Sequence, residues 1–515
     1  MSQGDTLPWN YPLVALSVLL SFLIFLFLHL IKPTKSKNSN LPPSPPKLPI
    51  LGNLHQLGAH PHLSLAKLAR KHGPVMHVQL GHVPALIISS AKAAEKIMKS
   101  HDQFFSSRPQ SSIANRLLYG CKDLAFAPYG EYWRQMRKVC VLHLLSVKRV
   151  QSFRCVREEE VANMVAELRS LSSSSGGPVG GAVNLSEALV ALTNDVFCRV
   201  AFGRKFNRSG GTNRFHAMLA EYLNLLGTFD VGDFIPSLFW VSGLNGFDAR
   251  VKKSVEELDT CFERMIEEHI QCRRDGGGDE RENILDVLFA LMQNDSSIGV
   301  ALSRDSIKAL ILDMFVAGTD TVHTAIEWAM AELIKHPETM KKARDEVDRT
   351  IGLGSVVKED DIETMNYLKM VVKEALRLHP PLPLLVPRES TEEVELFGYN
   401  LPSKMRIFIN AWAIGRDPES WEDPEEFYPE RFANIAVDFK GNDFELIPFG
   451  AGRRGCPGIH FAMPTIDLVI ASLLRYFDWE LPEGRRGEEL DMEEGTGITV
   501  HRKSRLLVIA KPRLA

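Results

Sequence analysis

A cysteine near the C-terminal end of the chain has the surroundings of a metal ligand. Cys456 follows residues 449–455, a run with three glycines and two arginines, and an apolar pattern typical of a helix begins directly after it. The free N–H groups and the dipole at the start of a helix favour a thiolate over a thiol. The sequence therefore predicts that Cys456 offers a thiolate to a soft or electron-demanding metal centre.

Two other interpretations apply to this stretch. Most intracellular cysteines are small buried hydrophobic residues. The glycines at 450, 452 and 455 also match the Gly-x-Gly-x-x-Gly fingerprint of dinucleotide-binding proteins. That match is disfavoured because Pro448 interrupts the strand that should precede it, and Pro457 opens the helix that follows, far from any N-terminal strand–helix–strand unit.

A second group of chemically capable residues lies in 307–334, a long helical pattern without proline. Ala317 and Thr321 are four residues apart and share one helix face. Gly318 costs a helix about 1 kcal/mol relative to alanine, so we expect a local loss of regularity that frees a carbonyl; close packing against a small residue is the alternative. Asp320 is ionisable and the Thr321 hydroxyl both donates and accepts, so together they could move protons.

Two further pairs occur at helical spacing. Trp133 and Arg137 are four residues apart, which taken alone predicts a surface arginine packed on a tryptophan. Glu374 and Arg377 are three apart, and such charged pairs usually lie on a solvated helix face and contribute about 0.2–0.5 kcal/mol. Arg431, in a Pro-Glu-Arg-Phe run downstream, could join the second pair.

These motifs together resemble the cytochrome P450 family, and most closely the plant A-type microsomal haem-thiolate monooxygenases of clan 71. The resemblance extends over essentially the whole chain. It implies haem b, iron protoporphyrin IX, with Cys456 as the axial thiolate and metal ligand. It further implies cofactor contacts from Trp133, Arg137, Ala317, Gly318, Arg388, Phe449, Arg454 and Gly458, proton delivery by Asp320 and Thr321, and a structural triad of Glu374, Arg377 and Arg431.

The activity implied by this resemblance is an NADPH- and O2-dependent monooxygenase reaction, in which a small hydrophobic plant specialised metabolite is hydroxylated or oxidatively rearranged. Coumarins and other phenylpropanoids, terpenoids, alkaloids and aldoximes remain open as substrates. Electrons would come from NADPH-cytochrome P450 reductase, since the chain has no flavin domain or convincing dinucleotide domain of its own. Two alternatives are a haem-thiolate dehydratase or isomerase on the same fold and a non-catalytic haem-binding membrane protein.

The patterning predicts a mainly α-helical protein with a small β subregion, folded as one interwoven P450-like catalytic domain over residues 50–515. Residues 75–80 and 85–89 read as a strand pair. The candidate site residues are spread from Trp133 to Cys456, which argues against separable modules. Pro464 should kink the helix that follows the cysteine loop.

The N-terminal region predicts a membrane anchor. Residues 11–31 are almost wholly apolar and long enough to cross a bilayer, and a basic, proline-rich hinge follows at 32–49. Lysines after the span place the body in the cytosol and residues 1–10 in the lumen, as in a single-pass protein of the endoplasmic reticulum. The net charge of −4 gives no basic footprint for nucleic acid, and seven scattered cysteines fit a reducing compartment.

Segments close to the predicted haem motifs are the candidates for binding the reductase and the substrate. An acidic reductase could dock near Arg134, Arg137 and Lys138, although Arg137 cannot freely serve both the reductase and the haem. Five segments are candidates for contact with substrate: 111–123, 229–239, 313–321, 383–386 and 495–498. Leu384, Leu385, Val386 and Ile498 supply apolar side chains there, which suits a hydrophobic molecule.

Overall fold

The computed structural model describes residues 14, 16–22, 24, 40–173, 182–205, 211–276, 281–293, 301–352 and 356–513. The predicted anchor and lumenal end lie largely outside these residues, and the described residues between 14 and 24 are helical. Two described helices, α14 (Arg304–Lys335) and α19 (Ile459–Tyr476), are long and apolar enough to span a membrane, but 78% and 72% of their most apolar windows are buried in the protein. They are core helices here.

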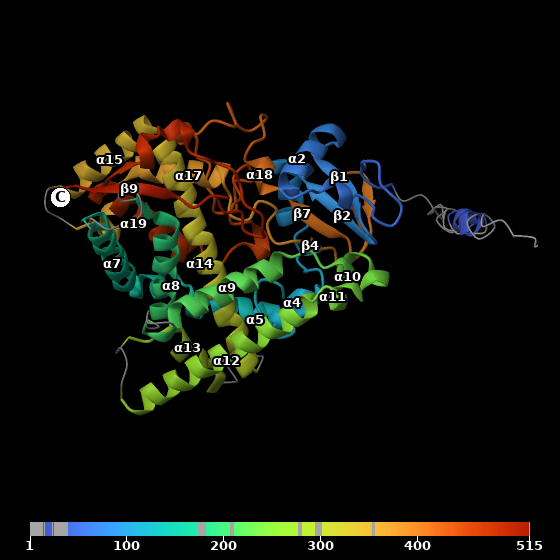
Figure 1. Cartoon of the computed structure of the whole chain (residues 1–515), viewed down its shortest axis with the longest axis horizontal. Coiled ribbons are helices and arrows are strands. Elements are labelled where there is room, and N and C mark those ends of the chain that lie inside the picture. The colour runs from blue at the N-terminus through green and yellow to red at the C-terminus, as the bar shows by residue number, and fades with distance from the viewer. Residues whose placement is uncertain are drawn as a thin grey trace, which may run out of the picture.

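Helices form most of the molecule. Of the two longest described helices, α14 passes through the middle and α12 (Phe247–Arg274) lies along one side (Figure 1). The helices are α2 (Pro61–His72), α3 (Ala91–Glu95), α4 (Ser112–Leu117), α5 (Glu131–Val139), α6 (Val147–Ser152), α7 (Arg154–Ser173), α8 (Leu185–Phe202), α9 (Gly211–Gly227), α10 (Val231–Phe234), α11 (Val241–Leu244), α12 (Phe247–Arg274), α13 (Ile284–Gln293), α14 (Arg304–Lys335), α15 (Pro337–Ile351), α16 (Glu359–Ile362), α17 (Asn366–Leu378), α18 (Ala411–Ile414) and α19 (Ile459–Tyr476). This confirms the mainly α-helical prediction.

The strands form three small sheets. The first has the order β1-β2-β7-β4, from β1 (Val75–Leu80), β2 (Val83–Ile88), β7 (Arg406–Ile409) and β4 (Arg388–Glu389). The second joins β3 (Ala182–Asn184), β9 (Leu507–Pro512) and β8 (Phe477–Glu480), and the third pairs β5 (Val394–Leu396) with β6 (Tyr399–Leu401). The predicted strand pair is confirmed, with β2 beginning two residues earlier than expected.

Sheets join segments that are far apart in the sequence. β2 pairs in parallel with β7, and β3 pairs antiparallel with β9 at the C-terminal end. The proline-rich hinge also reaches the first sheet, since the Pro43 carbonyl accepts a hydrogen bond from the His77 N–H of β1. These long-range pairings support the prediction of one interwoven domain, because they tie segments from both ends of the chain into the same sheets.

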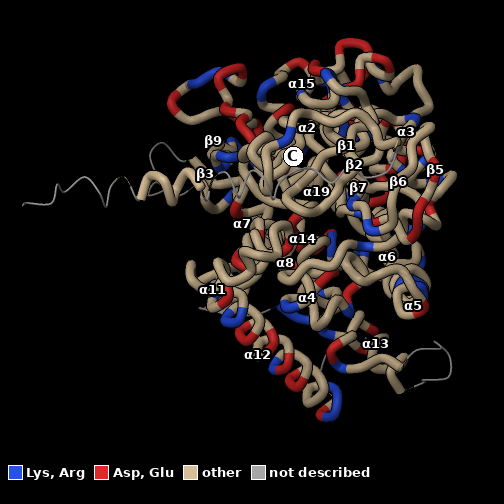
Figure 2. Tube along the Cα trace, turned by 90° about the vertical axis from the view of Figure 1, so that its right-hand side faces the viewer, with Lys and Arg blue, Asp and Glu red and all other residues tan. Residues whose placement is uncertain are grey.

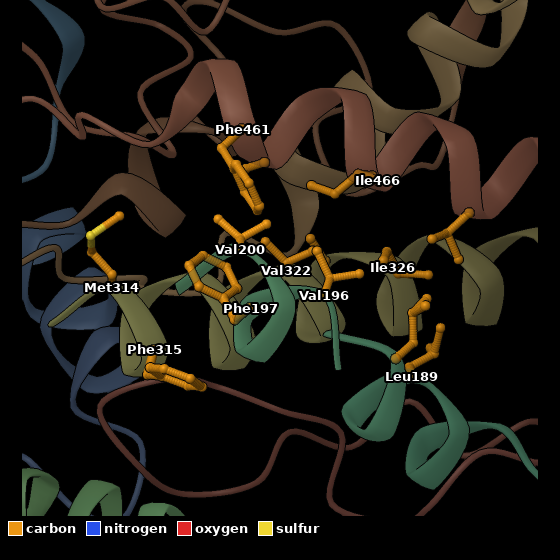
Figure 3. Packing of buried hydrophobic residues seen from close by; sticks show 14 of the residues in the cluster. Leu189, Val196, Phe197, Val200, Met314, Phe315, Val322, Ile326, Phe461 and Ile466 are labelled. Atoms are coloured by element: carbon orange, nitrogen blue, oxygen red, sulfur yellow. The ribbon is translucent and has the colours of Figure 1, made fainter. Parts of the chain in front are cut away.

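The core that positions the site is built around α14, with α8 on one side and α19 on another. Phe197 of α8 contacts Phe315 of α14 and Phe461 of α19, with ring centroids 6.0 and 4.9 Å apart (Figure 3). Val322 and Ile466 add aliphatic contacts to the same fully buried cluster. Aromatic pairs at these separations add stability beyond the area they bury, so this cluster fixes how the three helices cross.

Neither predicted distortion interrupts its helix. α14 is regular through Gly318, so the expected local loss of regularity is not found. Gly318 is required for packing instead, since a Cβ atom there would lie 2.0 Å from the Phe197 ring. α19 continues through Pro464, and the following residue, Thr465, donates a side-chain hydrogen bond to the Phe461 carbonyl.

Candidate functional site: an interior cavity facing Cys456

A cavity inside the molecule separates the middle of α14 from the loop before α19. Ala317 and Thr321 line it on the α14 side, and Phe449, Cys456 and Gly458 line it opposite. Ala317 and Cys456 are exposed although both lie in the interior, because their exposed surface faces this cavity. A flat group could therefore contact the cysteine with one face and α14 with the other.

The loop before α19 holds the sulfur in a fixed position. The Cys456 N–H donates to the Phe449 carbonyl at 2.9 Å, and the Gly458 N–H donates to the Cys456 Sγ at 3.3 Å. Gly450 and Gly452 adopt left-handed backbone conformations with φ of 66° and 67°, which side chains disfavour. A Cβ at Gly452 would also lie 2.0 Å from the Met98 carbonyl oxygen. The glycines thus serve the tight turn rather than a nucleotide.

Burial raises the pKa of the Cys456 thiol, and the N–H groups of Gly458 and Ile459 and the charge of Arg137 oppose that rise. The N–H groups at the helix start therefore favour the thiolate, as predicted, while desolvation favours the thiol. A cation at the sulfur would reverse the balance, since a coordinated thiol is deprotonated. The donors are then placed to stabilise a ligated sulfur.

Four arginines line the same cavity: Arg108, Arg137, Arg388 and Arg454. Burial lowers the pKa of Arg108 well below its usual range, and the charges of Arg454 and Arg388 lower it further. Burial and Arg388 likewise lower the pKa of Arg454 to about 9. Crowded buried cations of this kind favour an anionic ligand. The two carboxylates of haem b would match this cluster.

Trp133 and Arg454 support each other at the cavity wall. The Arg454 guanidinium lies 4.1 Å from the Trp133 ring centroid. It also donates to the carbonyls of Ser106, Leu124 and Ala127. The Trp133 Nε1–H donates to the Leu124 carbonyl at 3.0 Å, so it is already engaged.

Arg388 is tied to the cysteine loop from the other side. Its guanidinium donates to Asp102 Oδ1 and to the Ala451 carbonyl, both at 2.8 Å. The ion pair with Asp102 is almost fully buried. Arg388 therefore joins the first sheet, through β4, to the loop that carries Cys456.

The structure separates the two residues expected to deliver protons. Thr321 lines the cavity and its hydroxyl donates to the Ala317 carbonyl at 2.5 Å. The neighbouring Asp320 is buried and is not among the residues lining the cavity. Its Oδ1 lies 3.2 Å from Nε2 of His501 in the C-terminal segment. Successive helix residues point about 100° apart, so one turn cannot aim both at the same space.

Glu374, Arg377 and Arg431 come together as predicted. Both Glu374 carboxylate oxygens accept from Arg377 at 2.7 Å, and Oε1 also accepts from Arg431 at 2.9 Å. The remaining Arg377 donors go to the carbonyls of Gly415, Pro424 and Glu426. All three charges are buried, so the triad fastens α17 to residues 415–431, the chain that leads to the cysteine loop.

Several site residues were missed by the sequence reading. Arg108 and Asp313 line the cavity, although no motif or spacing marked Arg108. Asp313 lay inside a predicted substrate segment but was not given a role; burial and Asp123 raise its pKa. Cys140 also lines the cavity, and burial raises its pKa to about 12. His501 was also missed, because it lies far from Asp320 in the sequence and only the fold brings the two side chains together.

Two of the five predicted substrate segments line the cavity. Residues 313–321 and 383–386 contribute Met314, Leu385 and Val386 to the cavity lining. Segments 111–123, 229–239 and 495–498 supply no lining residue in the described chain. Leu384 packs instead against the first sheet. Other apolar lining residues came from outside the prediction, namely Leu310, Val322, Ala325, Pro381 and Leu382.

Comparisons with known proteins agree with this architecture. The family model for Cytochrome P450 matches residues 42–509. The chain is 50% identical over 504 residues to cytochrome P450 736A117 of Prunus mume, covering 97% of this chain and 96% of that protein. It is 53% identical over 467 residues to cytochrome P450 71A1 of Persea americana, covering 90% and 92%. Norfluorocurarine oxidase of Strychnos is 47% identical over 507 residues, covering 97% and 98%.

Solved structures share the fold. A zebrafish cytochrome P450 with progesterone superposes with a TM-score of 0.73 at 24% identity, covering 88% of this chain and 99% of that one. A second, with abiraterone, gives 0.74 at 23% identity. With the fold, the cysteine loop and near full-length relatives in agreement, the chain belongs to the cytochrome P450 family, as a haem-thiolate monooxygenase of the plant clan that includes the 71A and 736A enzymes.

Proposed function

We propose that this monooxygenase oxidises a small hydrophobic plant metabolite in the cavity between α14 and the cysteine loop. The observation that carries the proposal is the interior space lined by Cys456 on one side and by Ala317 and Thr321 on the other. Most of its lining is apolar, and a few polar groups converge on it, as expected of a site for a small hydrophobic molecule.

In this proposal the Cys456 thiolate would bind the iron of haem b, and Arg108, Arg137, Arg388 and Arg454 would hold the haem carboxylates. Bound haem would supply the activation of dioxygen and the transfer of one oxygen atom to the substrate. The chain contributes the orientation of the substrate through Leu385 and Val386, and proton movement through Thr321. NADPH-cytochrome P450 reductase supplies the electrons, as in the family.

The proposed surroundings are the membrane of the endoplasmic reticulum. Exposed apolar side chains occur at Ile50 and Leu51, and again at Phe239 and Trp240. The turn between β1 and β2 bonds to the first group and to the segment that leads to the second: the Gly81 N–H donates to the Leu51 carbonyl, and the His82 N–H donates to the Phe234 carbonyl, five residues before Phe239. A patch of this kind suits contact with lipid next to an N-terminal anchor.

Reductase docking is proposed at the exposed residues of α5. Arg134 and Lys138 are exposed, whereas Arg137 is partly buried and lines the cavity, so docking would use the first two. Acidic and basic residues are interspersed along α12 instead of forming a surface of one sign, which gives no support to a nucleic-acid partner (Figure 2).

The test is the reduced, carbon-monoxide-bound spectrum of the full chain. The wild type should show the red-shifted Soret band of thiolate ligation, and Cys456→Ala should lose it. Cys140→Ala is the matched control, because this second cysteine also lines the cavity and should leave the band intact. A wild type without the band, or a Cys456→Ala variant that retains it, contradicts the proposal.

The class of substrate can be identified by measuring which compounds change the haem absorption spectrum when they bind. Compounds from the phenylpropanoid, terpenoid, alkaloid and aldoxime classes would be screened for displacement of the haem's water ligand, and products identified with reductase and NADPH. Thr321→Ala should keep the carbon monoxide band but divert more NADPH from product to peroxide. Product formation without NADPH or reductase would favour the dehydratase or isomerase alternative instead.

A further inference from the structure

Asp320 is the last polar residue of α14 before the cavity-lining Thr321, yet its carboxylate faces away from the cavity. Its Oδ1 lies 3.2 Å from Nε2 of His501, on the segment that precedes β9. The Asp320 side chain is 8% exposed and the His501 side chain 33% exposed. The pair therefore connects a buried acid to a side chain with open surface.

The hydrogen bonds around His501 define its protonation. The Thr324 hydroxyl lies 2.6 Å from the Asp320 carbonyl, which can only accept, so Thr324 must donate there. His501 Nδ1 lies 2.7 Å from the same hydroxyl oxygen and must then be the donor. Nε2 faces an ionised carboxylate and must also carry a proton. With both nitrogens protonated, His501 is an imidazolium beside an Asp320 carboxylate.

The neighbouring charges agree with this assignment. Burial lowers the pKa of His323 to about 4, so its ring is neutral where it stacks on His501, 5.2 Å away at 7°. The Asp320 hydrogen bond raises the pKa of His501 against the effect of burial, and the Glu327 charge adds to that rise. Those two carboxylates and His323 are the titratable groups that face His501. Thr499, from its own segment, lies near Asp320 and favours the ionised form.

A bound cation does not explain the cluster as well. Ligand atoms of Asp320, His323 and His501 lie within 4.8 Å of one another. Two imidazole rings stacked in parallel cannot both direct an in-plane lone pair at one ion, and His323 Nδ1 already bonds the Thr319 carbonyl. The Asp320 Oδ2 atom, by contrast, is buried and has no hydrogen-bond partner of good geometry among the described residues. This oxygen is free to give a proton onward.

We propose that His501 is the positioning residue that holds the Asp320 carboxylate outside the cavity and returns protons to it during turnover. The proposal rests on the monooxygenase function proposed above. The proton on His501 Nε2 passes to Asp320 Oδ1, breaking the N–H bond and forming the O–H bond. The Asp320 carboxyl group then turns about its Cβ–Cγ bond and gives that proton to a water molecule on the Thr321 side, which breaks the O–H bond and restores the carboxylate. The neutral imidazole regains a proton from water at its exposed surface.

The first test measures the pairing itself in the folded holoenzyme. Thermal unfolding would be followed by loss of the haem band in the wild type, His501→Gln, Asp320→Asn and the double variant, between pH 5 and 9. Near neutral pH the double variant should unfold at about the temperature of the weaker single variant. The coupling should disappear as pH rises through the raised pKa of His501, because the imidazolium is then lost.

Lys503→Gln is the matched control for this cycle. It changes a charge two residues along the same segment, and Lys503 bonds the exposed Glu493 rather than Asp320. It should show no coupling with Asp320→Asn at any pH. Full additivity of the His501 and Asp320 effects across the whole pH range would overturn the proposal, because no ionic partnership would then exist.

The second test measures proton delivery. The assay uses excess reductase and no added substrate. NADPH-driven oxygen consumption by His501→Gln should fall by up to about 100-fold, which is the lower end of what a positioned proton-transfer group contributes. The solvent deuterium isotope effect on this rate should be larger than in the wild type. The fall in the oxygen-consumption rate at alkaline pH, seen in the wild type, should also be missing in Asp320→Asn. This comparison keeps His501 unchanged. Unchanged rate and isotope effect in His501→Gln would overturn the relay.

Different results would contradict the monooxygenase function and the role of His501. A wild type that lacks the red-shifted carbon monoxide band would remove the monooxygenase proposal. A wild type and His501→Gln variant that both keep the band, without coupling and without an isotope effect, would remove only the role of His501.

Discussion

The Arg454 guanidinium lies 4.1 Å from the centre of the Trp133 ring, so the two residues hold each other at the wall of the interior cavity. Both are buried, and a desolvated cation–π contact contributes about 2 kcal/mol. The indole also fixes the Leu124 carbonyl, to which Arg454 donates as well. Trp133 is thus the support on which an anion-binding arginine rests.

Trp133→Ala should lose haem more readily than the wild type. Removing a buried tryptophan costs about 3–5 kcal/mol of unfolding free energy and frees the Arg454 side chain to move. Haem content per protein and the thermal midpoint measure the effect. Arg134→Ala, one residue along α5 and exposed, should change neither; a Trp133→Ala variant with full haem content would contradict the assigned support role.

Glu374→Gln should destabilise the protein severely. The change leaves the buried charges of Arg377 and Arg431 without their shared carboxylate, at a cost of about 3–5 kcal/mol. We expect little folded holoprotein by the carbon monoxide spectrum and a lowered denaturation midpoint in what remains. Glu363→Gln, on an exposed residue before α17, should stay within about 0.5 kcal/mol of the wild type.

Gly318→Ala tests why this helix contains a glycine. Helix propensity alone predicts a gain of about 1 kcal/mol. The packing predicts the opposite, because the added Cβ meets the Phe197 ring at 2.0 Å, and overpacking costs about 1–3 kcal/mol. We expect net destabilisation in chemical denaturation, largely relieved by adding Phe197→Leu. A more stable Gly318→Ala single variant would show that the ring moves away freely.

Glu332 should give the protein a pH-dependent contribution to stability. A hydrogen bond from His379 at 2.7 Å and an ion pair with His336 at 3.2 Å outweigh burial and lower the pKa of Glu332 to about 2. A carboxyl with a depressed pKa stabilises the fold above its unfolded value of about 4.5, and that stability is lost as pH falls toward 2. Glu332→Gln should therefore cost about 3 kcal/mol at pH 7.

The difference between wild type and Glu332→Gln should shrink steadily below about pH 5, as measured by urea denaturation at fixed pH values. Glu338→Gln is the control, since this exposed residue in the first turn of α15 should show a small effect at every pH. A constant difference between pH 7 and pH 3 would mean that the ion pairs do not set the titration of Glu332.

Some features of the fold and site follow from local sequence, because they depend on neighbours along the chain. The turn around Cys456 needs glycines at left-handed positions, and the β1–β2 pair needs only short apolar runs and a tight turn. The Glu374–Arg377 contact likewise follows from helical spacing. These elements were predicted correctly because their partners lie within a few residues.

Other features were decided only by packing. The sequence predicted that Gly318 weakens its helix, but the structure shows that the Phe197 ring of α8 requires a glycine there. The sequence also paired Asp320 with Thr321, but the Asp320 carboxylate pairs with His501, 181 residues later. Arg108 lines the cavity only because of the fold, since no spacing in the sequence marks it. The sequence by itself determined the family, the ligand loop and the helical content, because short-range backbone geometry specifies them. Tertiary structure decided which charges are buried together and which way each side chain faces, since burial and crossing angles depend on residues far apart in the chain.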